Sequence, residues 1–280
     1  INIIQNATNV TIENVTATAA NYTVNVAASA PEAVVAIKNS TLDGLCTVNV
    51  AAAGAKVTVD NSTVNCNDNN TTAGESYAAL CLNKAAIGGS IIATNTTVNV
   101  TAGSDSEKGR NGAENGTVTI NDSTDGVSVT VAVITYPGSD NYHGFTSLAD
   151  AIEFAKAGDV VTLIREVTVA EKITIAKSIT LDGNGKAITY TGSDRAIDVP
   201  ANADAKVNVT IENLTVDCTA SYCQRGINYN DDGALVLNNV TVKGTNVTYA
   251  LNLPGSSDNC VVTITDSNIS GNIALNVWGE

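Results

Sequence analysis

The chain has 280 residues, of which 44% are hydrophobic and 15% charged, and its formal net charge at pH 7 is −14. This acidity argues against nucleic acid and anionic membrane surfaces as partners, because proteins bind both through clustered Lys and Arg. No stretch approaches the roughly 18 apolar residues of a membrane-spanning helix, so membrane insertion is not expected either.

A short phrase recurs along the chain. It has two alternating apolar residues, an Asn or Asp, a small or apolar residue, and then Thr-Val or a similar pair. Its copies begin at Val10, Val35, Val57, Val118, Val209, Leu235 and Val262. Strand-type alternation that repeats with a period in the twenties is typical of a stacked β-solenoid. The sequence therefore predicts an all-β protein built from stacked coils.

Residues 146–158 interrupt this pattern and have the signals of an amphipathic helix. Thr146 or Ser147 can cap its start, and Gly158 can end it. One face of the helix is apolar and carries Leu148, Ala151, Ile152 and Ala155. We expect the helix to cover the open end of a solenoid core, since uncovered coil ends expose unpaired strand edges.

The turn-rich segment 136–142 precedes this helix and marks a boundary. We predict the C-terminal part of a first solenoid over residues 1–136, a linker over 137–145, and a helix-capped second solenoid over 146–280. Because the repeat phrase is already running at Val10, we expect the chain to be part of a larger secreted protein.

In the second solenoid a short pattern, such as Gly226-Ile-Asn-Tyr, recurs with constant spacing. Stacking its copies gives an inward column of Ile227, Leu251 and Leu275, and an opposite column of Asn228, Asn252 and Asn276. A further polar column near a turn consists of Asn213, Asn239 and Asp266. Strands about 4.8 Å apart let amide side chains hydrogen-bond along the solenoid axis. We therefore expect these Asn residues to hold the coils together rather than to bind a ligand.

The segments 147–163 and 173–188, the second with a Leu-Asp-Gly-Asn-Gly turn, resemble the right-handed parallel β-helix proteins of the pectate-lyase-like fold. The likeness is greatest to repeat-rich, adhesin-like surface proteins. This resemblance implies a right-handed parallel β-helix and an extracellular location at the cell surface. The fold also hosts lyases, hydrolases and phage tailspikes, so function has to be argued from individual residues.

Sugar-cleaving proteins of that class gather carboxylates, a His and a basic residue on one face. The nearest approach here is the set Asp217, Arg225, Asp231 and Asp232. Inverting hydrolysis needs two carboxyl groups about 6.5–9.5 Å apart, but no Gly-His-Gly element accompanies this set. The Asp-Asp-Gly sequence is also typical of a turn. We therefore expect a protein that is not an enzyme, with these four residues as the catalytic alternative.

Carbohydrate binding would use exposed aromatic side chains, and the candidates are Tyr222, Tyr229, Tyr249 and Trp278. The alternative is that these aromatic side chains are scattered over the surface or pack at coil ends and bind nothing. No zinc motif occurs, so we expect neither a metal nor another cofactor. Acidic, Asn-rich loops such as 65–70 could hold Ca²⁺ at low affinity. The segment 182–185 lacks the ligand spacing of a calcium loop and predicts a tight turn.

The six cysteines allow disulfides or free thiols. Cys218 and Cys223 flank a short loop and are the first candidate pair, and Cys66 and Cys81 bracket a longer loop and are the second. The alternative is that the thiols pack in the core as small apolar groups. Asn-x-Ser/Thr sequons make a further set of candidates, for glycosylation, namely Asn39, Asn61, Asn213 and Asn239. Because the phrase itself generates these sequons, the sequence does not decide whether they carry glycans.

These features predict a non-catalytic, adhesin-like or structural module that contacts a protein or glycan on a host or neighbouring cell. One alternative is a β-helix protein that binds or cleaves polysaccharide as a lyase or hydrolase. Another is a spacer in a surface layer or stalk. The loops 66–81, 102–117 and 217–225 interrupt the period, so we expect contacts there.

Overall fold

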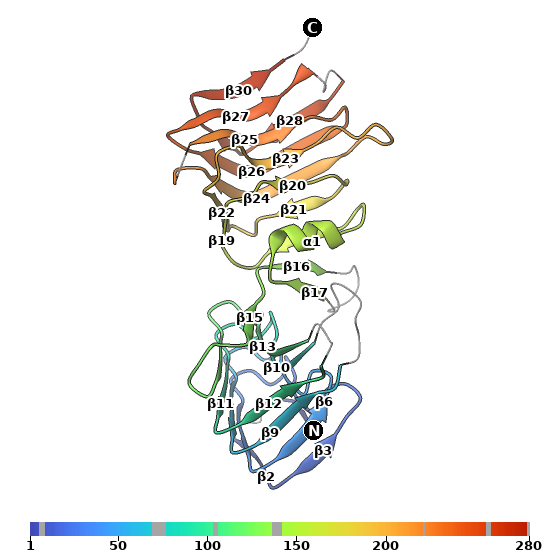
Figure 1. Ribbon diagram of the computed structural model, residues 1–280, viewed down its shortest axis with the longest axis vertical. Coiled ribbons are helices and arrows are strands. Elements are labelled where there is room, and N and C mark those ends of the chain that lie inside the picture. Colours follow the sequence, from blue (N-terminus) through green and yellow to red (C-terminus); the bar gives the residue numbers. More distant parts are fainter. Residues whose placement is uncertain are drawn as a thin grey trace. The chain divides into compact units, whose positions relative to one another are not determined.

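The computed structural model describes residues 1–5, 9–68, 77–102, 106–135, 142–220, 222–255 and 259–278. The chain divides into two compact units, Ile1–Thr130 and Val131–Glu280. In Figure 1 the first runs from blue to green and the second from green to red. Both units are stacks of parallel strands, which confirms the predicted all-β solenoid.

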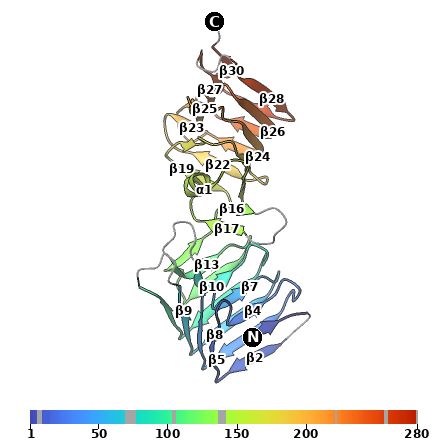
Figure 2. The same ribbon diagram turned by 90° about the vertical axis from the view of Figure 1, so that its right-hand side faces the viewer.

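The first unit winds around three walls of parallel strands. Within the described residues, one wall is ordered β14-β11-β8-β5-β2, with bounds Thr117–Ile120, Ser90–Thr94, Lys56–Asp60, Val34–Lys38 and Val10–Glu13. A second is ordered β12-β9-β6-β3, with bounds Thr97–Val100, Thr63–Cys66, Thr41–Gly44 and Thr16–Thr18. The third is ordered β1-β4-β7-β10-β13-β15, with bounds Asn2–Ile3, Val24–Val26, Val48–Val50, Ala78–Leu82, Glu107–Asn111 and Val127–Val129. Figure 2 shows β4, β7, β10 and β13 stacked one on another.

Side-chain alternation explains how these strands form walls. In β8, Val57 and Val59 are fully buried, whereas Lys56, Thr58 and Asp60 are exposed. Val57 lies beside the first apolar residue of the phrase in β5 and beside its counterpart in β11. Each coil therefore adds one thin layer of branched side chains to a continuous core.

The Asn of the phrase stands at the corner between two walls. Asn39 and Asn61 have left-handed backbone conformations, with φ of 48° and 45°. The same conformation occurs at Asn14, Asn95, Asn213, Asn239 and Asp266. Among residues with a Cβ, Asn and Asp adopt this conformation most readily. The corner therefore explains why the phrase carries Asn or Asp at this position.

The second unit has two parallel walls and an antiparallel start. In one wall, continuous strands β24 (Val209–Asp217) and β26 (Ala234–Lys243) run through the corner. The same sheet holds, within the described residues, β18 (Val160–Leu163), β19 (Val167–Val169), β21 (Thr180–Asp182), β22 (Ala187–Tyr190), β28 (Val261–Thr265) and β29 (Asn268–Ile269). The other wall is β20-β23-β25-β27-β30, with bounds Ile173–Thr174, Arg195–Val199, Cys223–Tyr229, Val247–Leu253 and Ile273–Val277.

The start of the second unit differs from the expected domain limits. Strand β16 (Ala132–Thr135) pairs antiparallel with both β17 (Tyr142–Phe145) and β18. It therefore belongs to the second unit, which starts at Val131 rather than after residue 136. Of the expected linker 137–145, residues 137–141 lie outside the described residues and residues 142–145 form β17. The single histidine, His143, is in that strand, and its ring lies 5.0 Å from the ring of Phe154.

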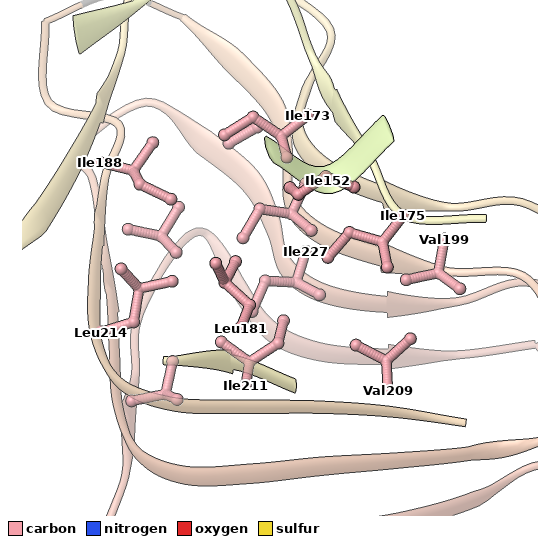
Figure 3. Close-up of a cluster of buried hydrophobic side chains, with 14 of the residues drawn as sticks. Ile152, Ile173, Ile175, Leu181, Ile188, Val199, Val209, Ile211, Leu214 and Ile227 are labelled. Carbon is pink, nitrogen blue, oxygen red and sulfur yellow. The ribbon is translucent and has the colours of Figure 1, made fainter. Parts of the chain in front are cut away.

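Helix α1 (Leu148–Phe154) covers the first coils of the second unit. Ser147 caps it by accepting a hydrogen bond from the backbone of Asp150. The expected apolar face, Leu148, Ala151, Ile152 and Ala155, is buried in the core cluster. Figure 3 shows Ile152 close to Ile173 and Ile175. The helix ends at Phe154, earlier than expected, and Gly158 instead forms a later turn with φ of 91°.

Candidate contact surface

An asparagine ladder runs along the wall β23-β25-β27-β30. Asn228 Nδ2 donates to Asp198 Oδ1 at 2.8 Å, Asn252 Nδ2 to Asn228 Oδ1 at 2.7 Å, and Asn276 Nδ2 to Asn252 Oδ1 at 2.6 Å. Asp198, Asn228 and Asn252 are 2–3% exposed. These contacts confirm the predicted column of Asn228, Asn252 and Asn276 and its role in joining coils.

Asp198 sets the direction of this ladder. An ionised carboxylate can only accept hydrogen bonds, so Asn228 must turn its NH₂ group toward Asp198 and its oxygen toward the next coil. The carboxylate also accepts from Lys172 Nζ at 3.1 Å and Arg195 Nη1 at 3.0 Å. Burial acts to raise the pKa of Asp198, but the bonds from Asn228, Lys172 and Arg195 outweigh it and hold the pKa below its usual value.

Other ladders in the chain have the same polarity. In the second unit, Asn239 Nδ2 donates to Asn213 Oδ1 at 3.0 Å, and Asn213 Nδ2 donates to Asp182 Oδ1 at 3.1 Å. In the first unit, Asn99 donates to Asn65, which donates to Asp43, and Asn61 donates to Asn39, which donates to Glu13. Each of these ladders ends at a carboxylate. The four glycosylation candidates, Asn39, Asn61, Asn213 and Asn239, thus use their Nδ2 atoms to join coils.

A cationic and aromatic column lies beside the Asp198 ladder. Strand register places Arg195, Arg225 and Tyr249 next to one another on successive coils. Arg195 pairs with Asp194 at 3.3 Å and with Asp198. Arg225 forms no ion pair with a described residue, and its buried Nε lacks a hydrogen-bond partner among them. The charge of Arg195 is thus matched by carboxylates, whereas the unmatched charge of Arg225 beside it favours an anion at this place.

Tyr222 lies at the corner between β24 and β25 and reaches the residue before Tyr249. Its side chain is 52% exposed. Its hydroxyl accepts a hydrogen bond from Thr248 Oγ1 at 3.2 Å, which ties it to β27. The surface formed by Arg195, Arg225, Tyr249 and Tyr222 is called the Arg225 surface below. It offers a guanidinium for an anionic group and an accessible ring for stacking.

The carboxylates proposed for the catalytic alternative hold the fold together. Asp231 is 2% exposed and accepts backbone N–H bonds from Asn202, Val207 and Gly233 at 2.8–2.9 Å. It thus attaches the loop between β23 and β24 to the turn before β26. Asp232 accepts a bond from the backbone of Asn259 at 3.1 Å.

Asp217 is engaged elsewhere, at the end of β24. It pairs with Lys243 Nζ at 3.0 Å and accepts from the Thr219 hydroxyl at 2.6 Å. Partial burial acts to raise the pKa of Asp217, but these bonds hold it below its usual value. Asp217, Asp231 and Asp232 therefore make different contacts, and among the described residues none of them pairs with Arg225.

The aromatic candidates fall into different environments. The proposal that Tyr229 binds carbohydrate is wrong, because its ring is fully buried in the core and its hydroxyl donates to Val207 O at 2.6 Å. The signal was present in the sequence, because Tyr229 lies two residues after the inward-facing Ile227 and alternation therefore places both on the core side of β25. Tyr249 is half-buried, and Trp278 is 64% exposed.

All six cysteines are free thiols in this structure. Cys218 and Cys223 are both fully buried, and their thiols are joined by a hydrogen bond. The predicted pair of Cys66 and Cys81 is not brought together. Cys66 lies in the core cluster, whereas Cys81 lies between the core residues Leu80 and Leu82 and so faces the other side of β10.

No group of His, Cys, Asp and Glu suited to a metal ion occurs in the described part of the chain. Part of the proposed Ca²⁺ loop 65–70 lies outside that part. The segment 182–185 forms the predicted tight turn, in which Asn184 donates its backbone N–H to Asp182 at 2.8 Å. None of the described helices is long and apolar enough to cross a membrane.

Comparisons with family models, with curated proteins and with solved structures found no match to this chain.

Proposed function

We propose that this chain is a non-catalytic, adhesin-like β-solenoid module of the pectate-lyase-like class that acts at the cell surface. Stacked coils give a stiff support, and the Arg225 surface makes the contact. A protein or glycan that carries carboxylate or sulfate groups on another cell is the partner that fits this surface. This contact lies within the predicted loop 217–225, where the exposure of Tyr222 supports it.

The bonding of Asp231 carries the non-catalytic part of this proposal. A general acid or base needs a carboxyl group that can reach substrate and exchange a proton. Asp231 is instead almost fully buried, and three backbone N–H groups occupy its oxygens. Asp198 also has a structural role, because it accepts the hydrogen bond of Asn228 at the end of the asparagine ladder.

The position of Arg225 carries the contact part. The chain carries a net negative charge, and yet two arginines lie side by side on neighbouring strands, so a local contact is the natural explanation for them. Asp198 and Asp194 neutralise Arg195, which leaves Arg225 with its charge available to a partner. Planar guanidinium groups recognise carboxylates and sulfates through paired hydrogen bonds. The exposed ring of Tyr222 adds a surface on which a sugar or side chain can stack.

A panel of immobilised acidic and neutral glycans tests both parts, with and without Ca²⁺. Retention of acidic glycans without release of products supports the proposal. Product release would show a lyase or hydrolase and would contradict it. Failure to retain any glycan or host-cell protein would favour the spacer alternative.

A further inference from the structure

The first unit holds a pair of cysteines on the outer side of its third wall. Cys81 lies in β10, beside Asn49 of the coil before and Arg110 of the coil after. Cys46 lies just before β7, the strand that pairs with β10. The two thiols are joined by a hydrogen bond. Residues from consecutive coils thus bring two sulfur atoms together.

We propose that Cys46 and Cys81 form a disulfide that links two consecutive coils of the first unit. The oxidant is a low-molecular-weight disulfide. The two thiols lose two protons and two electrons as their S–S bond forms, while the S–S bond of the oxidant breaks and yields two thiols. The structure shows the reduced state of this pair.

The third cysteine of this unit is separated from the pair by its side of the wall. Cys66 is 1% exposed and belongs to the core cluster, where its thiol donates to Leu45 O at 3.0 Å. Cys81 faces away from that cluster, between Leu80 and Leu82. A bond between Cys66 and Cys81 would need one of them to cross the wall, which a close-packed core resists.

The surroundings of Cys81 suit thiol–disulfide exchange. The hydrogen bond from Cys46 lowers the pKa of Cys81, and the nearby Arg110 guanidinium acts in the same direction against the effect of burial. Glu107 holds that guanidinium at 3.1 Å. Exchange proceeds through a thiolate, so a stabilised thiolate beside a second thiol favours closure of the bond. Cys46 is only partly buried, which gives a reagent access to the pair.

The cysteine pairs of the two units differ in the length of chain that separates their two members. Cys218 and Cys223 are close in sequence and enclose a short corner, as the sequence predicted. Cys46 and Cys81 enclose most of a coil together with the segment between β9 and β10. A cross-link that closes the longer loop restricts the unfolded chain more. The Cys46–Cys81 bond is therefore the one expected to raise the melting temperature of its unit by more.

The test uses the full chain equilibrated with mixtures of reduced and oxidised glutathione, followed by alkylation, proteolysis and mass spectrometry. We expect a peptide pair joined through Cys46 and Cys81. Cys46→Ser should abolish every cross-link that involves Cys81, while Cys66→Ser, the matched control, should leave the Cys46–Cys81 link intact. Cross-links through Cys66, or free Cys46 and Cys81 under conditions that oxidise a reference dithiol peptide, would overturn the proposal.

A second measurement separates the cross-link from a folding defect. Melting temperatures of the wild type and of Cys46→Ser are compared in oxidised and in reducing buffer. We expect oxidation to raise the wild-type melting temperature by several degrees and to leave that of Cys46→Ser without this gain. If Cys46→Ser is already destabilised in reducing buffer, the cross-linked peptides of the wild type alone decide the question. Equal gains in both proteins would contradict the assignment.

Discussion

Asn228 donates its Nδ2 hydrogen to Asp198 Oδ1 at 2.8 Å, and both side chains are almost fully buried. The carboxylate fixes which way the amide faces, and that amide fixes the next one. A single acidic residue therefore determines the orientation of a whole column. The same arrangement ends the ladders at Asp182, Asp43 and Glu13.

Replacing an inner ladder residue should destabilise the second unit more than replacing the last one. Asn228→Ala leaves Asn252 Nδ2 without its acceptor in a buried site. We expect the free energy of unfolding to fall by about 2 kcal/mol, since a buried polar group left unpaired costs about 1–3 kcal/mol. Asn276→Ala, the control, removes only one donor at a partly exposed position. Urea titrations of both variants measure the difference, and equal losses would contradict the ladder's role.

Acid should weaken the ladder through Asp198. Its folded-state pKa lies below the reference value of 3.8, so the ionised carboxylate contributes stability above that pH. The contribution disappears as the pH falls from 3.8 through the folded pKa. Unfolding measured across this range should show the wild-type advantage over Asp198→Asn shrinking with acid. An advantage that stays constant or grows in acid would show that the carboxylate charge is not responsible.

The corner conformation and the ladder bond can be separated at Asn61. Asn61→Gly loses the bond to Asn39 but accepts the left-handed backbone, whereas Asn61→Ala loses both. We expect the alanine variant to be less stable than the glycine variant by about 1 kcal/mol. Thermal unfolding of both proteins gives this difference. If alanine equals or exceeds glycine in stability, the positive φ is not what selects Asn in the phrase.

Asp231 should protect a loop rather than support a reaction. The residues 201–206 are exposed and are attached through backbone bonds to Asp231 at Asn202 and Val207. Asp231→Ala should speed tryptic cleavage after Lys206 several-fold, because local opening then requires less free energy. Asp232→Ala is the control, because Asp232 accepts its hydrogen bond from the backbone of Asn259, which is not part of this loop. Equal cleavage rates in the two variants would refute this role.

Much of the architecture could be predicted from the repeat phrase, because period and alternation determine which side chains face the core. The copy at 91–98 is harder to recognise, because Ala93 stands where the other copies carry Ile, Leu or Val. Its strands β11 and β12 nevertheless follow the register, with Asn95 at the corner. The period also predicts an interrupting loop over 102–117, but β13 lies within this segment and pairs with β10.

The candidate site was harder to predict than the fold. Tyr229 and Arg225 are both in β25, yet one ring fills the core and the other side chain lies on the outer face. Alternation from the inward Ile227 places Tyr229 in the core, but it would place Arg225 there too. The alternation breaks at the consecutive buried residues Gly226 and Ile227, and the sequence alone cannot show that break. The closeness of the Cys46 and Cys81 thiols is also hard to predict from the sequence, because it depends on the bend at residues 45–47, just before β7.

The most direct test of the account is binding of an acidic glycan by Arg225→Gln compared with Lys56→Gln. Both changes remove one positive charge, but Lys56 is an exposed residue of β8 in the first unit and is not part of the Arg225 surface. We predict that Lys56→Gln binds like the wild type, that Arg225→Gln loses at least about 10-fold in affinity, and that neither releases a product. Equal binding by the two variants, or cleavage of the glycan by the wild type, would contradict the proposed contact module.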